Sequence, residues 1–115
     1  MFCEHDRIVV AEHELAFVIR DGFPVTELNT LVIPKRHVTD YFGLYQPELN
    51  AINQLLQELK NDIVKEDDAV TGFNVGINAG ESAGQTVMPC HVHLIPRRAG
   101  DVEDPRGGVR GVDTA

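Results

Sequence analysis

Residues 84–98 have the sequence GQTVMPCHVHLIPRR, and this stretch decides both the fold and the chemistry of the chain. Within it, the segment CHVHL alternates apolar residues with histidines. This alternation predicts a β-strand, because successive side chains of a strand point to opposite faces. Cys90 and its apolar neighbours then face a core, and His91 and His93 lie side by side on the other face.

A loop rich in glycine and small polar residues precedes this strand, with the sequence NAGESAGQT at positions 78–86. Loops of this composition can bring backbone N–H groups close to an anionic ligand. Two imidazoles on a rigid strand, facing such a loop, indicate a site for phosphate chemistry.

Length and charge limit the classes of protein to which the chain can belong. A chain of 115 residues predicts one domain, residues 1–115, with a single core. The net charge of -8, from 10 basic and 18 acidic residues, argues against non-specific binding to nucleic acid or to an anionic membrane, since both need a basic surface. Basic residues do cluster locally, at 35–36, 97–98, 106 and 110, so a small anionic ligand is compatible with the charge.

The cellular compartment is predicted from the hydrophobic runs and the cysteines. No apolar run is long enough to span a membrane, and the N-terminus has no basic segment followed by a hydrophobic one. The two cysteines, Cys3 and Cys90, predict reduced thiols rather than a disulfide, because Cys90 is expected in a buried strand and Cys3 at the N-terminus. We therefore expect a soluble, cytoplasmic protein.

Further strands are expected before and after one long helix. The strands are predicted at 7–11 and 15–20, as a close antiparallel pair, at 30–33, ended by Pro34, and at 73–78. Thr39 is expected to cap a short helical turn, and residues 99–115 form a polar tail. This order of elements predicts an α+β domain with an antiparallel sheet.

The long helix is predicted to begin at Gln46-Pro47-Glu48, where proline and an acid suit a helix N-terminus. Glu48 is placed among the polar residues off the apolar stripe. The stripe follows the helical period and consists of Leu49, Ile52, Leu55, Leu56, Leu59 and Ile63.

The histidine pair has three interpretations. The first is a pair of ordinary side chains at a surface or interface. The second is a metal site, but further ligands could come only from scattered acids and from His5, His13 or His37, and no CxxC or HExxH motif accompanies the pair. The third is nucleophilic catalysis, in which one imidazole attacks phosphorus and the other binds the phosphate. We favour the third and predict no metal and no cofactor.

QTV at 85–87 followed by HVHLIPR at 91–97 resembles the signature of the histidine triad family, which comprises nucleotide hydrolases and transferases with the pattern H-φ-H-φ-H-φ-φ, where φ is apolar. The resemblance covers most of the chain. It includes FVIRD at 17–21, PVT at 24–26, TLVIPKRH at 30–37, the helix, Asn78, and PRGGVRGV at 105–112, which is similar to a bacterial branch.

The resemblance implies a fold and a mechanism. The fold is an antiparallel sheet of about five strands with one long and one short helix, and the sheet continues across a homodimer. His91 matches the family's nucleophile and would attack the α-phosphorus of a purine nucleotide, such as a diadenosine polyphosphate or a nucleoside phosphoramidate. Water would then hydrolyse the nucleotidyl-histidine. His93 would bind phosphate oxygens and support departure of the leaving group.

The same resemblance assigns residues that bind the substrate. Asp21 matches a position that hydrogen-bonds the ribose, and Asn78 matches one that also touches the substrate. The phosphates would be held by backbone and side chains of the loop, namely Gly84, Gln85, Thr86 and Val87, together with His93.

Two positions depart from the family pattern. The first histidine of the triad is Pro89 here, and an upstream histidine is Asn29, which we keep among the substrate-binding residues. Proline donates no hydrogen bond, and asparagine cannot carry a proton at neutral pH. Pro89 also predicts that strand pairing begins late or at an edge. We therefore predict a hydrolase acting through His91, with a nucleotide-binding module of little or no turnover as the alternative.

Overall fold

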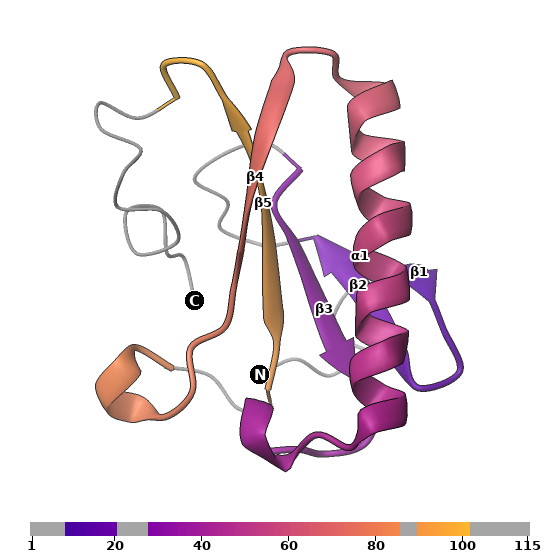
Figure 1. The fold of residues 1–115 in the computed structure, drawn as a ribbon, viewed down its shortest axis with the longest axis vertical. Helices are drawn as coiled ribbons and strands as arrows, with labels where there is room; N and C mark the ends of the chain where they lie inside the picture. The colour runs from indigo at the N-terminus through magenta and orange to yellow at the C-terminus, as the bar shows by residue number, and fades with distance from the viewer. Residues whose placement is uncertain (1–8, 21–27, 86–89, 102–115) are drawn as a thin grey trace.

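The computed structural model describes residues 9–20, 28–85 and 90–101, and it shows one sheet with a long helix packed on it (Figure 1). The predicted α+β class, with an antiparallel sheet of five strands and one long helix, is confirmed. The elements are β1 (Val9–Glu12), β2 (Ala16–Arg20), β3 (Thr30–Pro34), the 3-10 turn η2 (Tyr41–Gly43), α1 (Gln46–Glu66), β4 (Val70–Gly76), the 3-10 turn η3 (Glu81–Ala83) and β5 (Val92–Arg98).

The order of the strands in the sheet is β1-β2-β3-β5-β4, and every neighbouring pair is antiparallel. The last strand in the sequence, β5, therefore lies between β3 and β4. Its pairing with β3 covers Val92–Leu94, whereas its pairing with β4 continues to Arg98. Among the described strands, Pro96 thus lies where β5 is paired on one side, which is a position that tolerates proline.

The two faces of the sheet bury different side chains. We call the face that packs on α1 the helix face and the opposite one the histidine face. The helix face presents Ala16, Val18, Val32, Val92 and Leu94, against Ala51, Ile52, Leu55, Leu59 and Ile63 of α1. The histidine face presents Phe17, Ile19, Leu31 and Ile33. His93 belongs to this second face because its cross-strand partner is Leu31, and directly paired residues share a face.

The helix α1 begins at Gln46, as predicted, with Pro47 in its first turn. The prediction that Glu48 lies off the buried stripe is wrong, since Glu48 is only 5% exposed. Its carboxylate accepts hydrogen bonds from the Arg36 side chain and from the backbone N–H of Tyr45, just before the helix. A charged partner and a helix N-terminus together make this burial tolerable.

Several boundaries differ from the predictions, and β1 ends at Glu12 rather than 11 while β2 begins at Ala16 rather than 15. The fourth strand runs over Val70–Gly76 rather than 73–78, and β3 includes Pro34, which pairs with Ala16. The short turn η2 is capped by Asp40 rather than Thr39, because the Asp40 carboxylate accepts the N–H of Phe42 at 2.9 Å.

The strand β5 begins at Val92, two residues later than the alternation of CHVHL predicts. The N–H of Cys90 donates to the carbonyl of Val38 at 2.7 Å and so leaves the ladder of the sheet. The expectation that pairing begins late is thereby confirmed.

Cys90 is buried and carries a free thiol, as predicted. Cys3, the first residues of the first predicted strand and most of the tail lie outside the described residues. In the part of the chain that the structure describes, no helix combines the length and the apolar character needed to cross a membrane.

Candidate functional site

His91 and His93 lie together on the histidine face. Their ring centroids are 4.9 Å apart and their planes meet at 71°. The residues are 2% and 1% exposed, and the Nε2 atom of each is buried. His93 is part of β5, which fixes its position in the sheet, and His91 directly precedes the strand. Two imidazoles at this separation can act on the same small group.

Asn29 also lies on the histidine face, directly before β3, and is 2% exposed. It stands two residues before Leu31, the partner of His93, and is therefore a diagonal neighbour of His93 across the two strands. The preceding residue, Leu28, has a φ of 68°, which is strained for leucine. Its carbonyl accepts the Thr30 hydroxyl at 2.7 Å. Strained backbone of this kind tends to occur at functional sites.

The glycine-rich loop between β4 and β5 folds on itself around η3. Gly80 and Gly84 have φ values of 92° and 95°, in the left-handed region that favours glycine. The N–H groups of Gly84 and Gln85 donate to the carbonyls of Glu81 and Gly80, at 3.0 and 3.1 Å. The Asn78 amide reaches the Gly84 carbonyl at 3.5 Å. The backbone N–H groups of Gly84 and Gln85 therefore donate within the loop in this structure. That these two residues bind phosphate stays a prediction.

The side chain of Gln85 joins this loop to the segment before α1. Gln85 is 2% exposed. Its Oε1 accepts the N–H of Gly80 at 2.7 Å, and its Nε2 donates to the carbonyl of Thr39 at 2.8 Å. The neighbouring carbonyl, that of Val38, accepts the N–H of Cys90. One dipeptide, Val38–Thr39, therefore receives hydrogen bonds from Gln85 and from Cys90.

The segment that carries this dipeptide is anchored to the start of α1. Arg36 donates twice to the Glu48 carboxylate, at 2.9 and 2.7 Å, and once to the carbonyl of Gly43 at 2.8 Å. Its guanidinium lies 4.1 Å from the centre of the Tyr45 ring. These hydrogen bonds lower the pKa of Glu48 and raise the pKa of Arg36. Val38 packs against Gly43, where an added Cβ would lie 2.9 Å from Val38 Cγ1.

Cys90 adjoins His91 in sequence and is buried, at 1% exposed. Burial raises the pKa of its thiol to about 11, and the carboxylates of Asp40 and Glu48 add to the increase. The thiol therefore stays protonated at neutral pH. A protonated, buried thiol is a core side chain and not a second nucleophile.

Two of the basic clusters that could have attracted an anion, at 35–36 and 97–98, are paired with carboxylates. The pairs are Lys35 with Glu12, Arg36 with Glu48, Arg97 with Asp101 at 2.7 Å, and Arg98 with Asp67 at 2.8 Å. Their charges are balanced locally. Arg106 and Arg110 lie outside the described residues.

Several predicted residues of the site also lie outside the described residues. They are Asp21, Thr86 and Val87, together with Pro89. Within residues 9–20, 28–85 and 90–101, no group of three or more His, Cys, Asp or Glu side chains is placed to hold a metal ion.

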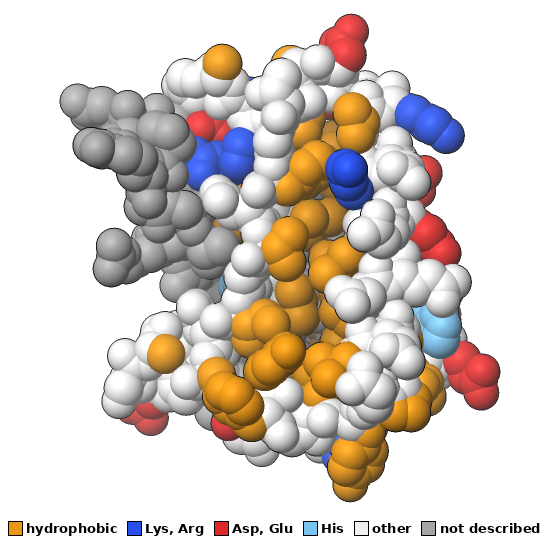
Figure 2. Space-filling view, viewed as in Figure 1, with side chains coloured by type: hydrophobic (Ala, Val, Ile, Leu, Met, Phe, Trp, Pro, Cys, Tyr) orange, Lys and Arg blue, Asp and Glu red, His pale blue; other side chains and the backbone are white. Residues whose placement is uncertain are grey.

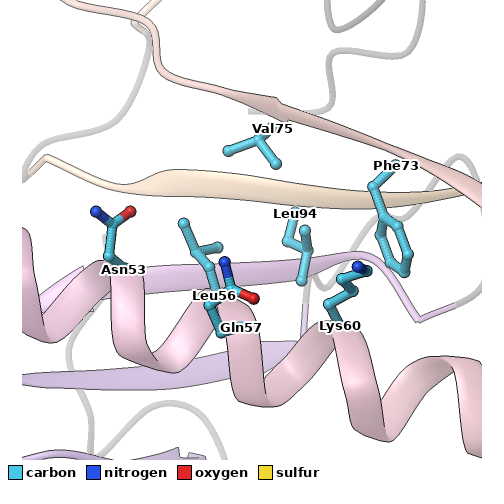
Figure 3. A pocket seen from close by; sticks show the side chains of 7 residues that line it. All are labelled: Asn53, Leu56, Gln57, Lys60, Phe73, Val75 and Leu94. Carbon is cyan, nitrogen blue, oxygen red and sulfur yellow. The ribbon is translucent and has the colours of Figure 1, made fainter.

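A groove follows the boundary between α1 and β4, on the helix face and so opposite the histidines. Figure 2 shows hydrophobic side chains gathered along this boundary. One hollow of about 330 Å³ is lined by Phe73 and Val75 of β4, Leu94 of β5, and Asn53, Leu56, Gln57 and Lys60 of α1 (Figure 3). A second hollow of about 320 Å³ shares Asn53, Leu56 and Val75 with it. No pattern in the sequence indicated this groove.

The sequence and the fold are similar to those of known proteins. The family model of the HIT domain matches residues 3–100. A HIT family protein from Bacillus anthracis has a structure with a TM-score of 0.77 and 39% sequence identity, covering 83% of this chain and 67% of that one. A zinc-bound histidine triad family protein from Mycobacterium smegmatis has a TM-score of 0.75 and 34% identity, covering 83% and 68%.

Among curated proteins, AP-4-A phosphorylase of Mycobacterium tuberculosis is 30% identical over 99 residues, which are 85% of this chain and 50% of that protein. The chain spans 50–62% of the length of the first curated relatives that it matches.

Proposed function

This chain belongs to the histidine triad family, whose members bind, hydrolyse or transfer nucleotides, and we propose that it hydrolyses purine nucleotides through a covalent bond to His91. The observation that carries the proposal is the pair of buried imidazoles, with ring centroids 4.9 Å apart on one face of the sheet. Neutral imidazole is a nucleophile near pH 7, and a second imidazole beside it can bind the phosphate under attack.

The proposed reaction has two steps. An imidazole nitrogen of His91 attacks the α-phosphorus, the bond to the leaving group breaks, and the leaving group departs with the bonding electron pair. Water then attacks the same phosphorus, and the phosphorus–nitrogen bond breaks. The products of the second step are a nucleoside monophosphate and free His91. His93 stabilises the phosphate oxygens in both steps.

The proposed substrates are a diadenosine polyphosphate or an adenosine phosphoramidate. The name of the M. tuberculosis relative, AP-4-A phosphorylase, favours the first. We assign the ribose to Asp21 and further substrate contacts to Asn29 and Asn78. The phosphates are assigned to the loop residues Gly84, Thr86 and Val87.

The alternative is a nucleotide-binding module with little or no turnover. Two residues favour it, since Pro89 and Asn29 stand where the family pattern has histidines. The loss of such partners around a reacting group commonly costs about 10- to 100-fold in activity.

The deciding experiment compares wild type with His91→Ala on both substrates, with mass analysis for a nucleotidyl adduct. We expect His91→Ala to lose about 10³-fold or more in turnover, because no other group replaces a nucleophile. The matched control is His37→Ala, which removes an exposed histidine. An assay with added phosphate detects transfer of the nucleotidyl group to phosphate instead of water. An assay with a chelator detects dependence on a metal ion. Nucleotide binding by wild type without turnover or adduct would establish the binding module instead.

We also propose that the protein is a homodimer joined through β4. This strand is an edge of the described sheet, and its Val75 is 54% exposed beside the apolar groove on α1. An open strand edge next to an exposed apolar surface is a site for pairing with a second chain. A second copy in a twofold arrangement would extend the sheet and cover the groove.

Sedimentation equilibrium of Val75→Lys tests the dimer. The control is Val10→Lys, because Val10 is similarly exposed, at 44%, but lies on the opposite edge strand β1. We expect a dimer for wild type and Val10→Lys and a monomer for Val75→Lys. A wild-type monomer, or a dimer that only Val10→Lys dissociates, would exclude β4 as the interface.

A further inference from the structure

We propose that Gln85 is a positioning residue, whose side chain sets the position of His91 relative to the glycine-rich loop rather than contacting the phosphates. This inference rests on the proposed function, since it concerns the site at which His91 reacts. It assigns Gln85 a different role from the one that the family resemblance implies.

The argument starts from the two hydrogen bonds of the Gln85 amide. Oε1 accepts the N–H of Gly80 at 2.7 Å, which fixes the beginning of the loop to its end. Nε2 donates to the carbonyl of Thr39 at 2.8 Å, which ties the loop to a segment 46 residues earlier in the chain. Both bonds are made by a residue that is 2% exposed, so water competes little for either group.

The second step concerns Thr39, whose carbonyl accepts the hydrogen bond from Gln85 Nε2. The carbonyl of Val38, next to that of Thr39, accepts the N–H of Cys90 at 2.7 Å. Cys90 directly precedes His91, so a single dipeptide holds both the end of the loop and the beginning of the histidine strand. The dipeptide can transmit position because Val38 is buried, at 4% exposed, and packs on Gly43 with no room for a Cβ there.

The third step is the fixation of the dipeptide itself. Arg36 binds the buried Glu48 carboxylate through two donors, and Glu48 accepts the N–H of Tyr45 at 2.8 Å. The start of α1 is therefore the rigid reference for the bridge through Val38–Thr39. A misplacement of about 1 Å between reacting groups can cost about 100-fold in rate, so a bridge of this kind matters for attack on phosphorus.

The experiment uses the full chain and two variants of Gln85. Gln85→Leu removes both hydrogen bonds. Gln85→Glu keeps the acceptor for the Gly80 N–H and loses the donor to Thr39. The matched controls are Gln54→Leu and Gln54→Glu, since Gln54 is exposed on α1 and donates only across one helical turn to Glu58 at 3.1 Å.

If Gln85 is a positioning residue, its substitution should lower kcat without changing nucleotide affinity. We expect kcat to fall about 10- to 100-fold in both Gln85 variants, with the Kd for AMP changed by less than about 3-fold. A protonated glutamic acid can donate to the Thr39 carbonyl, so Gln85→Glu should regain rate relative to wild type as the pH is lowered. A direct phosphate contact predicts the opposite pattern, in which Kd and KM rise.

A second readout does not depend on turnover. The NMR signals of the His91 ring and the Cys90 amide should shift in Gln85→Leu and stay in place in Gln54→Leu. If wild type shows no turnover, the proposed function fails while these signals still decide the positioning role. Unchanged His91 and Cys90 signals, or a raised Kd with unchanged kcat, would overturn the inference.

Discussion

The helix face and the histidine face are both buried, yet they are built in different ways. The helix face is a continuous apolar contact between the strands and α1. The histidine face combines four apolar side chains with two imidazoles and the Asn29 amide, all of them at most 5% exposed. Burying polar groups costs free energy that a wholly apolar face avoids. The difference teaches that one short segment, residues 91–94, combines core side chains, Val92 and Leu94, with His91 and His93, to which we assign the proposed chemistry.

If this division is correct, truncations on the two faces should have separable effects. Those on the helix face should lower the free energy of unfolding and leave the proposed activity of the folded protein unchanged. Those on the histidine face should lower the rate at comparable stability.

The largest effect is expected on the helix face, from Leu55→Ala. Leu55 is 2% exposed in the contact between α1 and the sheet. The variant should lose about 2–5 kcal/mol of unfolding free energy, because it removes buried methyl groups and leaves a cavity. Urea denaturation followed by circular dichroism measures the loss. Val64→Ala, on the same helix and 39% exposed, is the control and should change the value by less than about 0.5 kcal/mol. A loss below about 1 kcal/mol in Leu55→Ala would contradict the assignment of stability to this face.

The helix face was also the part of the molecule that the sequence specified best. The 3.6-residue period of α1 is a local pattern, and it correctly places Ile52, Leu55 and Ile63 in the core. The period fails at Glu48 because the partner that makes its burial tolerable, Arg36, is in a different element. Local patterns carry no information about such a partner.

On the histidine face, alternation placed the two imidazoles side by side, but it did not place the start of the strand. The hydrogen bond from Cys90 to Val38 takes Cys90 out of the ladder, and it joins residues 52 positions apart in the sequence. The bond from Gln85 to Thr39 is equally remote. Both use backbone carbonyls, which every residue type offers, so no sequence pattern could have indicated them.

A smaller effect is expected from the buried thiol of Cys90, directly before His91. Its folded-state pKa is raised from 9.0 to about 11, mainly by burial. The thiol thus prefers to ionise in the unfolded chain, so its contribution to stability is complete below pH 9 and is lost as the pH rises towards 11. The loss amounts to at most about 3 kcal/mol, at about 1.4 kcal/mol for each of the two pKa units.

The measurement is the unfolding free energy of wild type and Cys90→Ala between pH 8 and pH 11. Other groups also titrate in this pH range. The difference in unfolding free energy between the two proteins therefore isolates the contribution of the Cys90 thiol. We expect wild type to lose more stability than Cys90→Ala as the pH rises. Parallel curves would show that the thiol is accessible to water and that the apolar face does not extend to residue 90.

The smallest effect is expected from Asn29→Ala on the histidine face. Asn29 is a buried diagonal neighbour of His93, and its amide can orient an imidazole even though it cannot carry the proton of the histidine that the family pattern has there. The variant should lose about 10-fold in kcat, equivalent to about 1.4 kcal/mol of activation free energy, with KM nearly unchanged. Val32→Ala, on the helix face of the adjoining strand β3, is the control and should lose stability but not kcat. If Asn29→Ala matches wild type in kcat while His91→Ala is inactive, Asn29 does not orient the pair, and the rate must depend on His91, His93 and the loop alone.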